Sequence, residues 1–254
     1  MTVLDVMNVS VVLGSLLLLG KLHLAGLKSG YRAFSFFLVL AAIQNGIGTT
    51  LNTKGEAYFY FWLFSEPIEW FVAAWVVLDV YSQVLQDYRG LYTVGRWLLM
   101  VAVTIALLAS GLTLLIPSRS TGQGQLLACY YLAERAINFS LVVFLLTILL
   151  LLTRYPITLT RNVIVYSVVL SFFFLSYTAI YILVSTGGRS IISFAEYATQ
   201  GANLAALATW LAMLSRAGED RPQRLRPAWM PGREQELLNE LNSLNAALLK
   251  VACI

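Results

Sequence analysis

Hydrophobic residues in this chain fall into long, nearly unbroken runs rather than into the short alternating patterns of half-buried strands. A helix needs about 20 apolar residues to cross the roughly 30 Å of hydrocarbon in a bilayer. Seven runs approach or exceed that length: Val3–Gly20, Ala33–Leu51, Tyr58–Leu78, Trp97–Ile116, Leu126–Leu152, Asn162–Val184 and Ile191–Leu214. We therefore expect an all-α integral membrane protein with seven transmembrane helices.

The second and third runs are interrupted by polar residues. Gln44 and Asn45 lie in the second run, and Glu66, Pro67 and Glu69 lie in the third. These two spans are therefore the ones that a strict hydropathy threshold misses first.

Basic residues in the loops predict the orientation, because Lys and Arg are retained on the cytoplasmic side. Odd-numbered loops and the tail hold twelve of them: Lys21, Lys28, Arg32, Arg89, Arg96, Arg154, Arg161, Arg216, Arg221, Arg224, Arg226 and Arg233. Even-numbered loops hold three, which are Lys54, Arg119 and Arg189. This bias predicts an N-terminus outside and a C-terminus in the cytoplasm.

Composition supports the membrane assignment. The chain is 59% hydrophobic and 12% charged, whereas soluble domains average about 45–50% apolar and about 25% charged residues. We expect the lipid bilayer to be its partner, and we expect it to bind no nucleic acid. Two Cys and one His are too few for a zinc site with full protein ligation or an iron–sulfur cluster. We expect neither a metal nor a cofactor.

Past the last run, the composition changes to a basic, proline-containing linker at residues 216–232. We expect its side chains to face the anionic cytoplasmic leaflet. The residues predicted to lie at the membrane surface are Arg216, Arg221, Arg224, Arg226 and Trp229.

The final segment, residues 233–254, has the spacing of a short amphipathic helix. Its apolar positions follow the a/d pattern of a coiled-coil seam: Leu237, Leu241, Leu244, Leu248 and Val251. One interpretation places this helix on the bilayer or on the chain's own bundle. The other pairs it with a second copy, as a homodimer, or with a cytoplasmic protein partner. The predicted domains are thus a bundle at 1–215, the linker at 216–232 and the helix at 233–254.

Polar residues inside the spans are the candidates for a ligand-binding site or ion pathway, because ionisable groups are costly at membrane depth. By counting from the span ends, we place them in the outer half of the bundle: Glu66, Glu69, Glu134, Arg135, Glu196 and Asn45. One interpretation is a structural polar network that fixes helix rotation. The other is an outward-facing pocket for a cation, a hydrogen-bond donor or a proton.

No catalytic set accompanies these residues. The last span lacks the lysine on which a retinal Schiff base would form. Ser65 and Ser171 have no buried histidine to activate them, since His23 lies at the end of the first run. We therefore expect a protein without enzymatic activity.

In its seven runs and their predicted orientation, the chain resembles bacterial seven-helix sensor modules and uncharacterised bacterial seven-helix membrane proteins. The resemblance implies a location in the bacterial cytoplasmic membrane and a sensor or signalling role with a cytoplasmic output helix. A proton-coupled or cation transporter that uses the intramembrane glutamates is the alternative. A second alternative is an accessory or scaffold subunit of a membrane complex.

Overall fold

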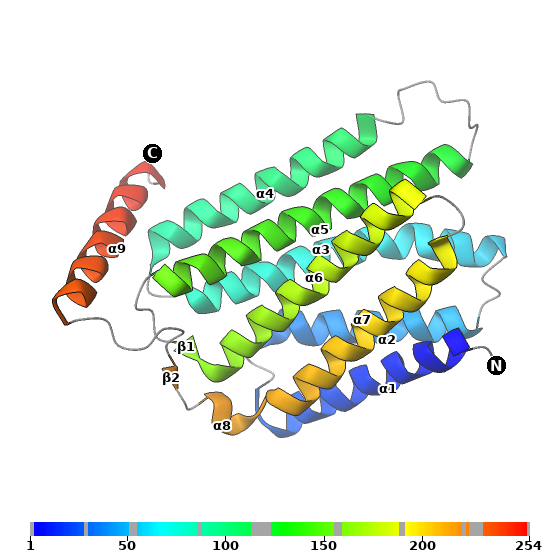
Figure 1. Ribbon diagram of the computed structural model, residues 1–254, viewed down its shortest axis with the longest axis horizontal. Helices are drawn as coiled ribbons and strands as arrows, with labels where there is room; N and C mark the ends of the chain where they lie inside the picture. The colour runs from blue at the N-terminus through cyan, green and yellow to red at the C-terminus, as the bar shows by residue number, and fades with distance from the viewer. Residues whose placement is uncertain are drawn as a thin grey trace. The chain divides into compact units, whose positions relative to one another are not determined.

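A computed structural model describes residues 3–27, 30–50, 55–85, 88–112, 123–154, 159–187, 191–219, 222–223 and 231–252. These residues are almost entirely helical (Figure 1). The helices are α1 (Val3–Leu24), α2 (Arg32–Thr50), α3 (Glu56–Val84), α4 (Arg89–Leu112), α5 (Gln123–Arg154), α6 (Arg161–Gly187), α7 (Ile192–Met213), α8 (Arg216–Glu219) and α9 (Pro231–Ala252). Two short strands, β1 (Leu159–Thr160) and β2 (Pro222–Gln223), pair in antiparallel fashion.

Helices occupy all seven apolar runs, so the all-α prediction is confirmed for the described residues. In this part of the chain, five helices are long and apolar enough to cross a bilayer: α1, α2, α3, the segment Leu132–Leu150 of α5, and α6. This identifies a membrane-embedded protein. Seven crossings and the orientation of the termini stay predictions.

The second and third runs, expected to be the first that a hydropathy threshold misses, are among these five, so that expectation is wrong. The two candidates that fall short are α4 and α7, for separate reasons. The described apolar stretch of α4 is shorter, at Gly90–Ile105. In α7, 22 residues long, the polar side chains of Glu196, Gln200 and Asn203 lower the mean hydropathy.

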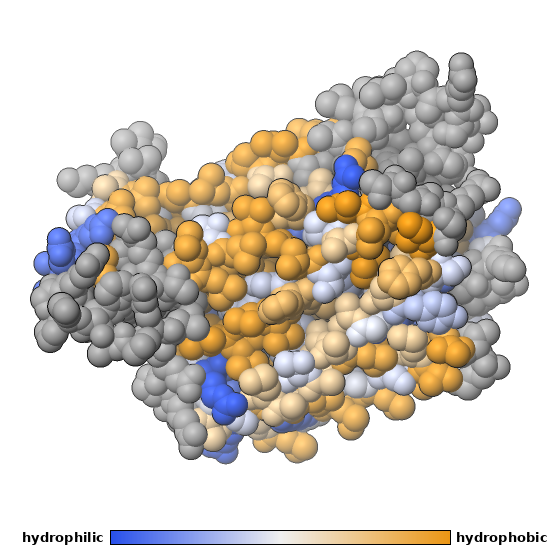
Figure 2. Space-filling model, viewed as in Figure 1, coloured by the Kyte–Doolittle hydropathy of each residue, from blue (hydrophilic) through white to orange (hydrophobic). Residues whose placement is uncertain are grey.

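Large apolar side chains on the surface agree with a lipid environment. Leu17, Phe64 and Phe71 are each about two-thirds exposed, and hydrophobic residues cover most of the coloured surface in Figure 2. In water such a surface would be an aggregation hazard. In a bilayer it faces acyl chains.

The chain divides into two compact units. Unit 1 comprises Met1–Asp79 and Phe172–Arg216, and unit 2 comprises Val80–Ser171 and Ala217–Ile254. The division falls inside α3 and inside α6, so each unit is built from segments that are distant in sequence.

Helix α1 packs against both α2 and α7 in unit 1. Gly14 allows this approach, because a Cβ there would lie 3.3 Å from Leu207 Cδ1. An aromatic core joins α2, α6 and α7. Trp210 of α7, 1% exposed, meets the ring of Phe34 edge-on at 4.7 Å, and Phe37 meets Phe173 of α6 at 5.9 Å.

In unit 2, α4 packs against α5 and α9. Tyr81 occupies the start of this unit: its hydroxyl donates a hydrogen bond to the Leu91 carbonyl at 2.7 Å. Its ring stacks on Tyr92 at 5.9 Å and contacts Phe144 at 4.8 Å. Where β1 pairs with β2, the buried amide of Asn162 donates to Glu219 Oε2 at 2.9 Å.

Helix α9 covers most of the predicted terminal helix and packs on the chain's own α4. Asn245 Oδ1 accepts hydrogen bonds from the backbone N–H groups of Gly90 (2.7 Å) and Leu91 (3.4 Å). Leu241 is buried, Leu237 and Leu248 are partly buried, and Leu244 is exposed. The side chain of Val251 lies outside the described residues. Packing on the bundle is thus the supported alternative, and pairing with a second chain stays a prediction.

The predicted linker is only partly described. Residues 216–219 form α8, with an exposed Arg216, and residues 222–223 form β2. Arg221, Arg224, Arg226 and Trp229 lie outside the described residues, so their predicted place at the membrane surface stays a prediction.

Candidate functional site

Three polar side chains follow one face of α7. Glu196, Gln200 and Asn203 are spaced four and three residues apart, and residues at this spacing are neighbours on a helix surface. The helix therefore presents a polar stripe to the rest of unit 1.

A chain of hydrogen bonds runs from this stripe to two other helices. Gln200 Nε2 donates to Asn45 Oδ1 of α2 at 3.1 Å. Asn203 Nδ2 donates to Gln200 Oε1 at 3.4 Å, and the Tyr177 hydroxyl of α6 donates to Asn203 Oδ1 at 3.0 Å. Asn45 is held in turn by its own Nδ2, which donates to the Ala41 carbonyl at 2.8 Å. Three helices are thus linked by side-chain amides and a phenol.

Glutamates of α3 lie beside this chain. The Gln44 side chain hydrogen-bonds the carboxyl group of Glu69. The Tyr58 hydroxyl lies within electrostatic range of the carboxyl groups of Glu66 and Glu196. We call these nine side chains the polar network: Gln44, Asn45, Tyr58, Glu66, Glu69, Tyr177, Glu196, Gln200 and Asn203.

The network extends several turns along α3. Glu69 follows Glu56, the first residue of α3, by thirteen positions, or about 20 Å along the helix axis. Glu66 and Glu69 are partly buried, whereas Glu196 is exposed. Carboxyl groups at that depth are costly unless they are hydrogen-bonded, neutralised or paired with a cation.

Its charge balance is acidic. The sequence of α3 contains no Lys or Arg, and neither does that of α7. Amide and carboxyl oxygens accept hydrogen bonds and attract cations. The arrangement therefore suits a small cation, a ligand with several N–H or O–H donors, or a proton.

Four of the six predicted site residues belong to this network: Asn45, Glu66, Glu69 and Glu196. The other two, Glu134 and Arg135, lie on α5 in unit 2. Glu134 is buried there, one helical turn from the buried Asn138. Four of the six thus lie together in unit 1, and their role as a ligand-binding site or ion pathway stays a prediction.

Sequence reasoning left out Gln200, Asn203, Tyr177 and Tyr58. A signal for the first two was present, since the four-and-three spacing with Glu196 marks a polar face on an otherwise apolar helix. Tyr177 and Tyr58 carried no such signal, because tyrosines are common at membrane interfaces without any ligand.

In the described residues, no group of three or more His, Cys, Asp or Glu side chains is arranged to hold a metal ion. The ligands of any cation at the polar network would therefore include amide and hydroxyl oxygens as well as carboxylates.

No protein-family model, no curated protein and no solved structure matches this chain. Functional inference therefore depends on the chemistry of the polar network and on the contacts of α9.

Proposed function

We propose that this protein is a non-enzymatic membrane sensor in which the polar network binds a small cationic or hydrogen-bond-donating ligand, or a proton, from the outside. The observation that carries the proposal is the hydrogen-bonded chain from Asn45 through Gln200 and Asn203 to Tyr177, with Glu69 joined to Gln44 beside it. The proposed orientation has the N-terminus outside and the C-terminus in the cytoplasm.

Polar groups at this depth carry an energetic cost that a purely structural contact does not require. Insertion of an acidic side chain at the centre of a helix costs about 2.5–3.5 kcal/mol, and α3 carries both Glu66 and Glu69. Apolar residues would pack these helices without that cost. The presence of Glu66 and Glu69 despite this cost supports a role for them in binding a ligand.

The network also connects several helices, which gives a ligand a means of changing their packing. A cation that draws Glu69 away from Gln44 would free the Gln44 amide to pair with α7. Only a ligand with different affinities for the two arrangements shifts their populations. The acceptor-rich, base-free composition of α3 and α7 supports a ligand that brings positive charge or donors.

We assign the output to α9. Its Asn245 contacts the first turn of α4. Ser243 and Ala247, two positions to either side of Asn245 and therefore on the other side of the helix, are exposed. A helix attached at one face and open at the other suits a cytoplasmic protein partner.

The test places a fluorophore on α9, at Asn242→Cys, in a variant whose two native cysteines are replaced. The protein is reconstituted in vesicles with the predicted outer face accessible, and the probes are protons, methylammonium and guanidinium. We expect at least one probe to change the fluorescence of the labelled protein. Glu69→Gln, which keeps the size of the side chain and removes its charge, should abolish that change.

Glu56→Gln is the matched control, because Glu56 lies in the first turn of the same helix and is exposed. It should respond as the unsubstituted protein does. A full response in Glu69→Gln, or no response of α9 to any probe, would contradict the proposal.

Transport is the second candidate, and the surplus of acidic groups in the polar network favours it. A proton or cation transporter would move its probe across sealed vesicles at a rate that falls with Glu69→Gln. Flux without a change at α9 supports transport, and a change at α9 without flux supports sensing.

A further inference from the structure

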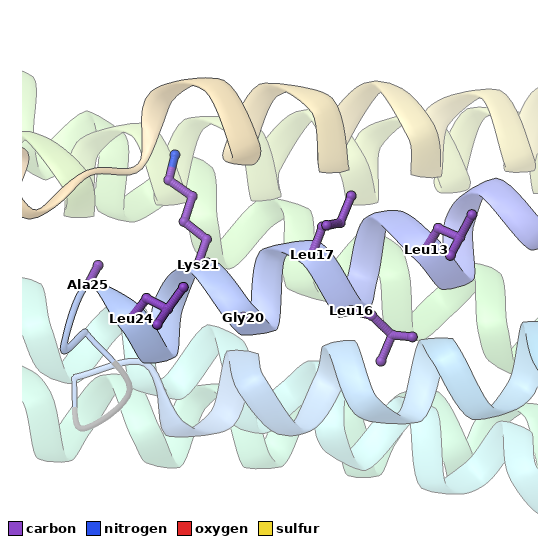
Figure 3. A pocket seen from close by; sticks show the side chains of 7 residues that line it. All are labelled: Leu13, Leu16, Leu17, Gly20, Lys21, Leu24 and Ala25. Atoms are coloured by element: carbon purple, nitrogen blue, oxygen red, sulfur yellow. The ribbon is translucent and has the colours of Figure 1, made fainter.

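A groove of about 640 Å³ runs along one face of α1 (Figure 3). It is lined by Leu13, Leu16, Leu17, Gly20, Lys21, Leu24 and Ala25. In Figure 3, Leu17 and Lys21 project from α1 towards the neighbouring α7, and Leu16 projects to the opposite side. The groove is therefore a long apolar surface with one charged group near its end.

Its length matches one leaflet of a bilayer. From Leu13 to Leu24 the helix advances eleven residues, or about 16 Å, against a hydrocarbon half-thickness of about 15 Å. Lys21 lies three residues before Leu24, the last residue of α1, and Ala25 lies just past the end of the helix. The charged group thus lies at interfacial depth, and the leucines extend from it towards the middle of the membrane.

Lys21 is fixed in place rather than extended into solvent. Its Nζ donates a hydrogen bond to the Leu211 carbonyl, in the last turn of α7. An ammonium group has three N–H donors, and this bond uses one of them. Helix C-termini also hold a cation favourably, so the ammonium is positioned at the rim of the groove with further donors to offer.

Other charges at this end of unit 1 are mainly positive. Arg32 begins α2 directly after the loop from α1, Arg216 follows α7 by three residues, and both side chains are exposed. Asp79, near the end of α3, is the acidic residue that the chain brings to this end of unit 1. No acidic residue lines the groove itself among the residues described.

We propose that this groove is a binding site for one anionic phospholipid, whose acyl chain lies along Leu13, Leu17 and Gly20 and whose phosphate is bound by Lys21. Charge complementarity selects an anionic headgroup, and the leaflet-length apolar surface selects a lipid rather than a soluble phosphate. In the proposed orientation this is the cytoplasmic leaflet, where anionic lipids provide the negative surface potential. The site is separate from the polar network and does not depend on the sensor proposal.

Gly20 allows the acyl part of the site to be tested without disturbing the fold. An ideal Cβ at this position meets no protein atom within 4 Å. Gly20→Leu therefore fills the groove and leaves Lys21 unchanged. Gly46 of α2 has the same open surroundings, which makes Gly46→Leu its matched control.

The charge is tested with Lys21→Gln and with the conservative Lys21→Arg. Arg96 is exposed on α4, outside unit 1, so Arg96→Gln is the control for loss of one positive charge elsewhere. The experiment measures lipid retained on the detergent-extracted full chain by native mass spectrometry. Its probes are phosphatidylglycerol and phosphatidylcholine with identical acyl chains, each with and without added inorganic phosphate.

We expect the unsubstituted chain to retain phosphatidylglycerol in preference to phosphatidylcholine. Lys21→Gln should reduce that preference about fivefold, the factor that one lysine contributes near an anionic surface, and Lys21→Arg should keep it. Gly20→Leu should reduce retention of both lipids, and both control variants should behave as the unsubstituted chain does.

Equal retention of the two lipids by the unsubstituted chain would overturn the proposal. An unchanged preference in Lys21→Gln would also overturn it, as would displacement of the lipid by inorganic phosphate alone. If Lys21→Gln fails to fold, Gly20→Leu decides the outcome, because normal retention in that folded variant contradicts the site.

Discussion

Tyr81 occupies space that Gly95 leaves open. An ideal Cβ on Gly95 would overlap the phenol group of Tyr81. The ring has little freedom to move aside, because its hydroxyl is bonded to the Leu91 carbonyl and its faces contact Tyr92 and Phe144. A single missing methyl group therefore permits the approach of α4 to the end of α3.

Gly95→Ala should lower the free energy of unfolding by about 2 kcal/mol. Overpacking costs about 1–3 kcal/mol, and displacement of Tyr81 forfeits a hydrogen bond, which together exceed the 0.5–1 kcal/mol that Ala gains over Gly inside a helix. Thermal unfolding in detergent measures the change. Gly46→Ala, whose Cβ would meet no protein atom within 4 Å, should be neutral or stabilising. Equal effects of the two substitutions would show that the Tyr81 contact is unimportant.

Trp210 gives a second residue-scale prediction. It is 1% exposed and contacts Phe34 at 4.7 Å, so Trp210→Ala should destabilise unit 1 by about 3 kcal/mol through loss of packing. Trp97, which is 68% exposed, is the control, and Trp97→Ala should change stability by less than about 0.5 kcal/mol. The same unfolding assay compares them, and a similar loss in both would contradict the assignment of Trp210 to the core.

At the scale of elements, α9 supplies a cap to α4. The first N–H groups of a helix lack partners within the helix, and the Asn245 side chain satisfies those of Gly90 and Leu91 from a helix far along the chain. This contact cannot be predicted from the sequence of α4 or of α9 alone.

Asn245→Ala should destabilise the first turn of α4 by about 1 kcal/mol, the usual effect of losing a capping side chain. Hydrogen exchange should accelerate at the amides of Gly90 and Leu91, and also in α9. Asn245→Asp should retain protection, because a carboxylate is a good acceptor at the positive end of a helix. Asn242→Ala, at an exposed position of α9, should leave exchange unchanged. Unchanged exchange in Asn245→Ala would remove the capping role.

The elements also show how far the sequence is informative. Apolar runs located α1 to α7, because backbone hydrogen bonds in a bilayer must be satisfied within the segment itself. Glu66, Glu69, Glu196 and Asn45 were recognisable as candidates from their cost in lipid. The pairing of Gln200 with Asn45 was not, since it depends on the rotation and register of α2 against α7. The rotation and register are set by packing contacts between distant residues, such as that of Phe34 on Trp210. No local pattern in the sequence predicts such contacts.

For the whole molecule, the distribution of loop charges predicts an N-terminus outside and a C-terminus in the cytoplasm, which reporter fusions can test. Alkaline phosphatase fused after Gly187, in a loop predicted to lie outside, should be active. The same reporter fused after Ile254 should be inactive in the cytoplasm, where a fluorescent-protein fusion should be bright. The reverse pattern would contradict an N-terminus outside.

The hydrogen bond from Lys21 to Leu211 has a consequence for biosynthesis. Its partners are 190 residues apart, and translation at about 5–20 residues per second separates their appearance by roughly 10–40 s. For most of that interval α1 has been synthesised and α7 has not. The face of α1 that later contacts α7 must therefore wait among lipids or insertion factors, so unit 1 is completed only after the whole of residues 80–171 has been made. Slowing elongation near residue 172 should prolong the lifetime of this incomplete unit and its sensitivity to membrane proteases.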